Sequence, residues 1–252
     1  MKGALVTGAG LRIGRALALA LAADGYFVFV HHNRSVAGAR ATVAAIAAAG
    51  GRAKAVRADL SSARQAEALV GKCRMRGVRL TCLVNNASLF KLDRAPTATA
   101  ADFDLHMAIN LRAPLLLSQA LARQLPAGET GVIVNLLDQK LYNLNPDFLT
   151  YTLSKIGLQG LTTLLAQSFA PRLRVAGIAP GLTLRSGSQT DARFAEQHAA
   201  NPLGVGVTTD DIVRALRFIV ATPSFTGETL LIASGEHLTG RPRDIAFDKK
   251  KK

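Results

Sequence analysis

The sequence predicts a single α/β domain in which a doubly wound, parallel, seven-stranded sheet is flanked by helices. Short apolar runs alternate with Ala/Leu-rich stretches over almost the whole chain. These runs lack the polar alternation of a strand with one face in water, so we expect strands buried on both faces. The 252 residues are 49% hydrophobic, and no linker or shift in composition divides them. We therefore expect one domain over residues 1–245, followed by a basic tail over residues 246–252.

The predicted elements follow one another as strand and helix, which is typical of right-handed βαβ units. The strands are predicted at Ala4–Thr7, Tyr26–Val30, Ala53–Ala58, Leu80–Val84, Gly131–Leu136, Arg174–Ile178 and Thr229–Ile232. The helices are predicted at Arg15–Ala23, Val36–Ala49, Ala63–Arg76, Leu105–Leu121 and Thr152–Ala170, several of them ended by Gly or Pro. The least regular stretch, Gly181–Val207, is long enough to form a loop over a site.

The composition restricts the possible classes of function. A net charge of +14 suggests nucleic acid or an anionic membrane as a partner. However, the basic residues are scattered, aromatic residues make up 5% of the chain, and four of the charges form the terminal run Lys249–Lys252. A nucleic-acid-binding or redox-sensing protein is therefore a remote alternative. No apolar run approaches the roughly 18–20 residues of a membrane span, so we expect a cytoplasmic protein.

The chain offers no spacing typical of a metal site or a disulfide framework. Cys73 and Cys82 are the two cysteines, and they are too few and too isolated for either. We predict no bound metal and two reduced thiols. Of the five histidines, His31 and His32 are candidates for contacting a phosphate, while His106, His198 and His237 are expected on the surface or in loops.

A glycine-rich loop, Thr7-Gly8-Ala9-Gly10-Leu11-Arg12-Ile13-Gly14, joins the first predicted strand to a helix. Such a loop lets a pyrophosphate approach the backbone and the free N–H groups of the helix, although alone it can also be an ordinary turn. After the second strand, an NAD-binding unit has an acid that holds the ribose 2′-OH. Here the sequence reads His32-Asn33-Arg34-Ser35. Arg34, with Arg12 from the loop, fits a 2′-phosphate, so the predicted cofactor is NADP(H).

Tyr151 and Lys155 are four residues apart, on one face of a predicted helix. A neighbouring ammonium lowers the pKa of a phenol and makes it a usable acid or base near neutral pH. Together with the glycine-rich loop and four further segments in order, this pair resembles the short-chain dehydrogenase/reductase family over nearly the whole chain. Those four segments are Asp59-Leu60, Asn85-Asn86-Ala87, Asn110 and Pro180-Gly181.

The resemblance implies a Rossmann fold, a homotetramer and specific residue roles. Tyr151 would donate the proton, Lys155 would bind the nicotinamide ribose and lower the pKa of the tyrosine, and Asn110 would anchor a water. Asp59 would meet the adenine, and Pro180-Gly181 would border the nicotinamide. The full cofactor set implied is Gly8, Arg12, Ile13, Gly14, His32, Asn33, Arg34, Ser35, Asp59, Leu60, Asn86, Ala87, Tyr151, Lys155, Pro180, Gly181 and Leu182.

The departures from the family pattern suggest the substrate. Asp138 stands thirteen residues before Tyr151, where the family usually has a Ser that binds a carbonyl. A carboxylate would repel a ketone oxygen but suits ring nitrogens, which donate to it or take its proton. Arg12, Ser88 and Phe90 also depart from the pattern, and with Asp138 they resemble the pteridine reductase branch, including bacterial dihydromonapterin and dihydrofolate reductases. In that branch the phenylalanine stacks a flat pterin against the nicotinamide.

These observations predict NADPH-dependent reduction of a C=N bond in a dihydropterin, with Ser88, Phe90, Asp138 and Tyr151 contacting the substrate. An alternative is a carbonyl reductase of the same family that acts on a 3-oxoacyl thioester or a small ketone. Two local alternatives also stand: Asp138 could be a surface acid on a displaced loop, and Phe90 could be an ordinary core residue or a loop anchor. Ala176 and Ser234-Gly235-Glu236 depart from the family as well, at positions that the resemblance does not make catalytic.

Overall fold

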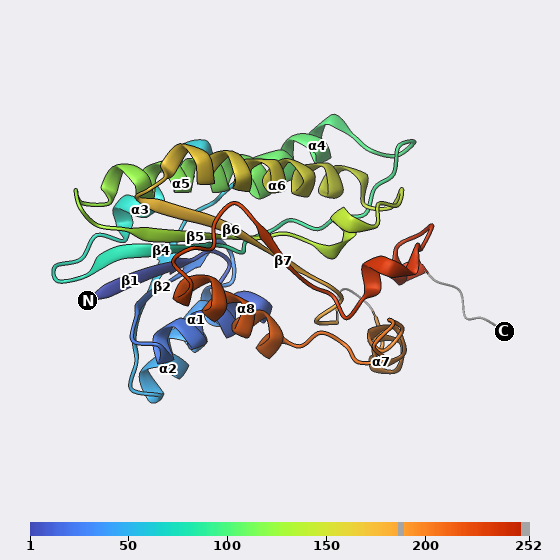
Figure 1. Cartoon of the computed structure of the whole chain (residues 1–252), viewed down its shortest axis with the longest axis horizontal. Coiled ribbons are helices and arrows are strands. Elements are labelled where there is room, and N and C mark those ends of the chain that lie inside the picture. The colour runs from blue at the N-terminus through green and yellow to red at the C-terminus, as the bar shows by residue number, and fades with distance from the viewer. Residues whose placement is uncertain (186–188, 248–252) are drawn as a thin grey trace.

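The computed structural model describes residues 1–185 and 189–247, and it confirms the predicted α/β fold. Seven parallel strands form one sheet in the order β3-β2-β1-β4-β5-β6-β7 (Figure 1). The order reverses between β1 and β4, and the crevice outside the carboxyl ends of strands at such a reversal is where α/β sheets bind ligands. The strands are β1 Lys2–Val6, β2 Phe27–His32, β3 Arg52–Arg57, β4 Arg79–Asn85, β5 Gly131–Leu136, β6 Leu173–Pro180 and β7 Thr229–Ile232.

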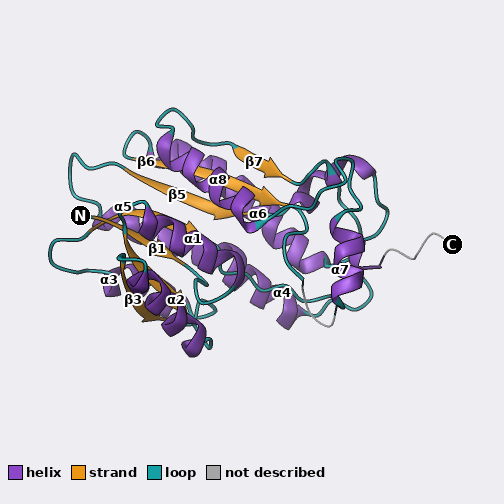
Figure 2. Cartoon of the chain, turned by 90° about the horizontal axis from the view of Figure 1, so that it is seen from below, coloured by secondary structure: helices purple, strands orange, loops and turns teal. Residues whose placement is uncertain are grey.

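Helices cover both faces of the sheet (Figures 1 and 2). One face carries α1 Arg12–Ala23, α2 Val36–Ala48 and α8 Thr209–Ala221; the other carries α3 Ala63–Lys72, α5 Ala113–Gln124 and α6 Leu149–Phe169. Neighbouring strand residues therefore enter different cores: Val6 belongs to the same core as Leu17 of α1, and Leu5 to the same core as Leu117 of α5. This two-sided burial is the physical reason why the strands read as continuous apolar runs.

The structure corrects three predicted boundaries. The helix predicted at Leu105–Leu121 is α4 Ala100–Met107, a π-helical turn Ala108–Arg112 and then α5. The region predicted as a loop at Gly181–Val207 contains α7 Asp191–His198, which Thr190 caps; its residues 186–188 lie outside the described residues. The predicted tail begins too early, because Ala246 and Phe247 belong to a packed 3₁₀ turn, Ile245–Phe247. Residues 248–252, with the terminal lysines, lie outside the description.

None of the helices described is long and apolar enough to cross a membrane. Within the same residues, no group of three His, Cys, Asp or Glu side chains is arranged to hold a metal ion.

Candidate active site

A cavity of about 990 Å³ opens at the carboxyl ends of the central strands, where the sheet order reverses. It receives residues from the β1–α1 loop, the segments after β4, β5 and β6, helices α6 and α7, and the C-terminal turn. The predicted site residues that line it are Gly8, Arg12, Ile13, Gly14, Asn86, Ala87, Ser88, Phe90, Asp138, Tyr151, Lys155, Pro180, Gly181 and Leu182. His32, Asn33, Arg34, Ser35, Asp59, Leu60 and Asn110 are not among the lining residues.

The glycine-rich loop is shaped for close backbone approach. Gly8 has a φ of +65°, and a Cβ on Gly14 would stand 2.4 Å from the carbonyl oxygen of Gly8. No side chain caps the start of α1, where Leu11 is the N-cap residue, so the first N–H groups of this helix remain available for a ligand. A helix N-terminus of this kind binds phosphate groups, so this end of the cavity fits a dinucleotide.

His31 holds the glycine-rich loop by a hydrogen bond and is not placed to contact the 2′-phosphate of a cofactor. Its Nδ1 accepts a hydrogen bond from Gly8 N at 3.1 Å, and its Nε2 donates to Ala58 O at 3.2 Å. The side chain is 2% exposed, and burial lowers its pKa to about 4. The expectation that His31 contacts the 2′-phosphate is therefore wrong, because a buried neutral imidazole with both nitrogens engaged has no contact left to offer.

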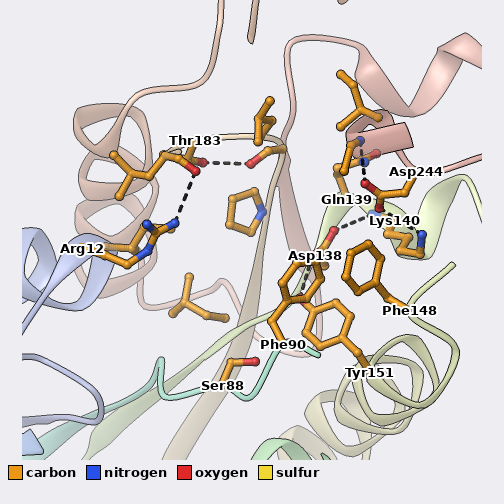
Figure 3. A pocket seen from close by; sticks show the side chains of 18 of the residues that line it. Arg12, Ser88, Phe90, Asp138, Gln139, Lys140, Phe148, Tyr151, Thr183 and Asp244 are labelled. Carbon is orange, nitrogen blue, oxygen red and sulfur yellow. Dashed lines mark hydrogen bonds and ion pairs between the residues drawn. The ribbon is translucent and has the colours of Figure 1, made fainter. Parts of the chain in front are cut away.

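The two arginines predicted at the 2′-phosphate differ in their surroundings. Arg12 has a φ of +55°, which suits the glycine usual in the family, and its guanidinium donates to Leu184 O at 3.3 Å and Arg185 O at 2.5 Å. Figure 3 shows this side chain beside Thr183, in the segment after β6. Arg34 lies near Asp59, whose pKa is lowered mainly by hydrogen bonds from Ser61 and, less, by the Arg34 charge. Phosphate binding by these arginines stays a prediction.

The predicted catalytic residues meet at the other end of the cavity (Figure 3). Tyr151 Oη donates to Asp138 Oδ2 at 2.6 Å. Asp138 lies two residues after the end of β5. Its Oδ1 accepts a hydrogen bond from Lys140 N at 2.8 Å, and this bond fixes the orientation of the carboxylate. Lys155 Nζ donates to Leu136 O at 2.6 Å and lies 5.7 Å from the centre of the Tyr151 ring. The alternative that Asp138 is a surface acid on a displaced loop is therefore wrong.

Burial dominates the electrostatics of this group. It raises the pKa of Asp138, and it raises the pKa of Tyr151 well above 10, with the Asp138 charge adding to the effect. Burial lowers the pKa of Lys155 to about 8, while the charge of Asp138 opposes that shift. The prediction that Lys155 lowers the pKa of Tyr151 is not met here, because desolvation and the carboxylate outweigh the cation. Tyr151 therefore keeps its phenolic proton near neutral pH, and it donates this proton in the hydrogen bond to Asp138.

Asn110 connects the segment after β4 to α6. It lies in the π-helical turn, is 1% exposed, and its Oδ1 accepts from Leu89 N at 2.8 Å. Its Nδ2 donates to Ser154 Oγ at 2.9 Å, and the Ser88 hydroxyl donates to Asn110 Oδ1 at 3.3 Å. Isolated π-turns are frequent at functional sites. Here the turn holds the segment that carries Ser88 and Phe90; the anchoring of a water by Asn110 stays a prediction.

Aromatic rings form one wall of the cavity. Phe90 is 48% exposed, stacks on Phe148 at 4.1 Å between centroids with an 18° interplanar angle, and meets Tyr151 edge-on at 4.7 Å. The alternative that Phe90 is an ordinary core residue is therefore wrong. Phe148 was not identified from the sequence. Its φ of +56° places it at the start of α6, and no sequence signal marks that conformation.

Further charged groups near Asp138 were also missed. Glu236 is buried, accepts a hydrogen bond from Leu182 N at 3.2 Å, and has its pKa raised by burial. Asp244 accepts from the buried Lys140 ammonium at 3.2 Å. The departure at Ser234-Gly235-Glu236 was the available signal for the first acid. Asp244 lies far along the chain, and only the fold brings it to the cavity.

The prediction that His106 is a surface or loop residue is also wrong. The ring is fully buried, its Nδ1 lies 2.8 Å from Thr150 Oγ1, and it meets Tyr151 edge-on at 6.3 Å. Thr150 N in turn donates to Asp93 Oδ1 at 3.1 Å. His198 lies in α7, where its Nε2 is 2.8 Å from Val207 O, and His237 is partly buried in a 3₁₀ turn. His106 was not recognised as buried because polar residues lie near it in the sequence and suggested an exposed position.

Comparison with known proteins agrees with this geometry. The family profile described as short chain dehydrogenase matches residues 2–197, and the chain belongs to that family. An uncharacterized oxidoreductase of Methylorubrum extorquens is 36% identical over 242 residues, which cover 93% of this chain and 97% of that protein. A 3-oxoacyl-[acyl-carrier-protein] reductase of Synechocystis is 30% identical over 241 residues, covering 92% and 95%. The structure of FolM alternative dihydrofolate reductase 1 from Brucella canis, complexed with NADP, is 38% identical with a TM-score of 0.90, covering 94% of each chain.

Proposed function

We propose that this protein is an NADPH-dependent reductase of a dihydropterin, such as dihydromonapterin, dihydrobiopterin or dihydrofolate. The observation that carries the proposal is the partly buried hydrogen bond from Tyr151 Oη to Asp138 Oδ2 at 2.6 Å, beside the half-exposed ring of Phe90. A carboxylate at this position disfavours a ketone oxygen and favours a ring nitrogen. The similarity to a dihydrofolate reductase of the FolM type supports the same substrate class.

The residues at the glycine-rich end of the cavity fit the phosphates of NADP(H). The uncapped start of α1, the close approach at Gly14 and the basic residue Arg34 after β2 favour a pyrophosphate and a 2′-phosphate. The FolM structure and a short chain dehydrogenase structure from Burkholderia cenocepacia both contain NADP. When bound, the cofactor supplies a hydride to the carbon of the C=N bond.

The side chains of this chain position the ring and supply the proton. Phe90 offers an aromatic face on which a flat heterocycle stacks, a contribution of roughly 1 kcal/mol beyond area burial. As the carbon is reduced, the electron pair of the C=N bond moves to nitrogen, which takes a proton from the Tyr151–Asp138 pair. Lys155, held by Leu136 O, keeps a positive charge beside the tyrosine. Holding the ring at the right distance lowers the barrier by several kcal/mol.

The proposal is tested by measuring NADPH and NADH oxidation with dihydromonapterin, dihydrobiopterin, dihydrofolate and a ketoacyl thioester. We expect turnover with a dihydropterin and preference for NADPH. Tyr151→Phe and Asp138→Ala are each expected to lower kcat by about 10²-fold or more while NADPH binding persists, because each removes part of the proton source. Tyr142→Phe is the matched control, since this tyrosine is exposed and does not line the cavity. Wild-type dihydropterin reduction by Asp138→Ala would show that the mechanism is wrong.

The second candidate is reduction of a 3-oxoacyl thioester or small ketone. The Synechocystis relative favours it, as do the Tyr151 and Lys155 positions, which suit carbonyl reduction equally well. It leaves Asp138 and Phe90 without a use. NADPH oxidation with a ketone but with none of the dihydropterins would select this candidate.

We infer that the protein assembles as a homo-oligomer, by resemblance a tetramer. Helix α6 exposes Leu153, Ile156 and Leu164, and α4 exposes Phe103 and Leu105. Exposed apolar side chains gathered on neighbouring helices are typical of an interface between subunits. Light scattering after gel filtration tests this directly, and a monomer would contradict it.

A further inference from the structure

The C-terminal segment Arg243–Phe247 forms part of the cavity wall, although it is distant in sequence from the other lining residues. Asp244, Ile245 and Ala246 all line the cavity. Figure 1 shows this last turn lying beside α7, at the carboxyl end of the sheet, and Figure 3 shows Asp244 beside Lys140 and near Asp138. The segment therefore borders the substrate end of the cavity.

Asp147, which precedes α6, anchors this segment. Its side chain is fully buried, and it accepts hydrogen bonds from Arg243 Nε at 2.7 Å, Arg243 Nη2 at 2.8 Å and Asp244 N at 3.0 Å. Arg94, from the segment after β4, donates its Nε to the same carboxylate at 2.6 Å. A buried carboxylate with a bidentate arginine is a strong and directional attachment. One side chain thus joins the C-terminal segment to the two segments that carry Phe90 and Tyr151.

Phe247 continues this attachment into the aromatic wall. Its ring lies 5.1 Å from the Arg94 guanidinium and 5.2 Å from that of Arg243, so it lies near both cations that bind Asp147. The centroid of the Phe247 ring also lies 6.1 Å from that of the Phe148 ring, and Phe148 stacks on Phe90. A displacement of the segment would therefore be transmitted to the ring on which we expect the substrate to stack.

The other side of the segment Arg243–Phe247 is hydrogen-bonded to helix α7, which follows β6, and to Lys140, which follows β5. Arg193 Nη2 of α7 donates to Ala246 O at 3.1 Å, and the Gln197 amide donates to Ile245 O. Lys140 Nζ donates to Asp244 Oδ2 at 3.2 Å. None of these hydrogen bonds involves Tyr151 or Lys155, so the segment can change where a substrate lies without breaking the hydrogen bonds of the proton donor. Asp244 acts on that donor only at a distance, because its charge adds to the raised pKa of Asp138 and of Tyr151.

We propose that Asp147 is a positioning residue that holds Arg243–Phe247 as the substrate-selecting wall of the cavity. The wall presents one carboxylate, Asp244, next to the apolar Ile245 and Ala246. This pattern suits the edge of a flat ring that carries N–H donors, because the carboxylate accepts from the donors while the apolar groups pack on the ring. The inference rests on the proposed function for the class of substrate.

Arg243→Gln tests this role, because it removes two of the hydrogen bonds to Asp147 and leaves the cavity lining intact. We expect the KM for dihydropterin to rise about fivefold or more, since a loosened wall no longer positions the ring. We expect kcat and the Kd for NADPH to stay within about twofold of wild type. The matched control is Arg217→Gln, which breaks another bidentate arginine–aspartate pair, with Asp24, on the face carrying α1 and α8; its KM should not change.

A KM for Arg243→Gln equal to that of wild type would overturn the inference, as would an equal loss of NADPH affinity. Phe247→Ala is the second variant, chosen because it loosens the same segment without exposing a buried charge, and the same rise in KM is expected. If both variants fail to fold, the segment is a structural support of the whole domain and the inference is wrong. If the wild-type enzyme reduces only ketones, the proposed function fails, and the KM comparison with that ketone still tests the wall.

Discussion

The buried histidine under the glycine-rich loop gives a quantitative prediction about stability. His31 is neutral in the folded protein because burial lowers its pKa from 6.5 to about 4. Between these values the unfolded chain binds a proton that the folded chain does not, so stability rises with pH and is lost as the pH falls below 6.5. At pH 5 this linkage amounts to about 2 kcal/mol, and at pH 7.5 it is close to zero.

The perturbation is His31→Gln, measured by urea unfolding at pH 7.5 and pH 5. At pH 7.5 we expect the variant to be about 1–3 kcal/mol less stable than wild type, because Gly8 N and Ala58 O lose well-placed partners. At pH 5 the difference should shrink by about 2 kcal/mol, since only wild type carries the unfavourable linkage. Other titrating groups, such as Asp138 and Glu236, are common to both proteins and cancel in this comparison. An unchanged difference at the two pH values would refute the neutral, buried histidine.

Three further outcomes are expected. Gly14→Ala should weaken NADPH binding by about tenfold or more in a fluorescence titration, because its Cβ would stand 2.4 Å from the Gly8 carbonyl. Gly71→Ala, with no atom near the added Cβ, is the control and should bind normally. Asp93→Ala should lower the unfolding free energy by about 1–3 kcal/mol in urea, because the buried N–H at the start of α6 loses its acceptor. Both cysteines should react with a thiol reagent only after unfolding, since burial raises the pKa of each to about 12; reaction in the folded state would contradict this.

The sheet could be predicted because burial on both faces leaves a direct mark on the sequence. Each of the seven predicted strands overlaps an observed one, and the glycine-rich loop runs into α1 as expected. The π-helical turn at Ala108–Arg112 left no such mark, because its residues are compatible with an ordinary helix. Helix α7 was missed since it is short and largely polar, although Thr190 was an available capping signal.

The candidate site, like the fold, could be predicted from the sequence only in part. Tyr151 and Lys155 were found from their spacing, and Asp138 from its offset to the tyrosine, because one helix and one adjoining strand place them within reach. The direction of the pKa of Tyr151 was predicted wrongly. Spacing along a helix indicates which charges are near, whereas the cost of burying them depends on everything packed around the site.

The sequence by itself determined the α/β fold, the glycine-rich loop and the residues Asp138, Tyr151 and Lys155 that meet in the cavity, because each depends on residues that are neighbours in the chain or at the ends of successive strands. Only the tertiary structure showed that His31 and His106 are buried, that Phe148 stacks on Phe90, and that Asp147 binds the C-terminal segment. These contacts join residues that different elements bring together. Their energies come from desolvation and packing, which no local pattern of amino acids records.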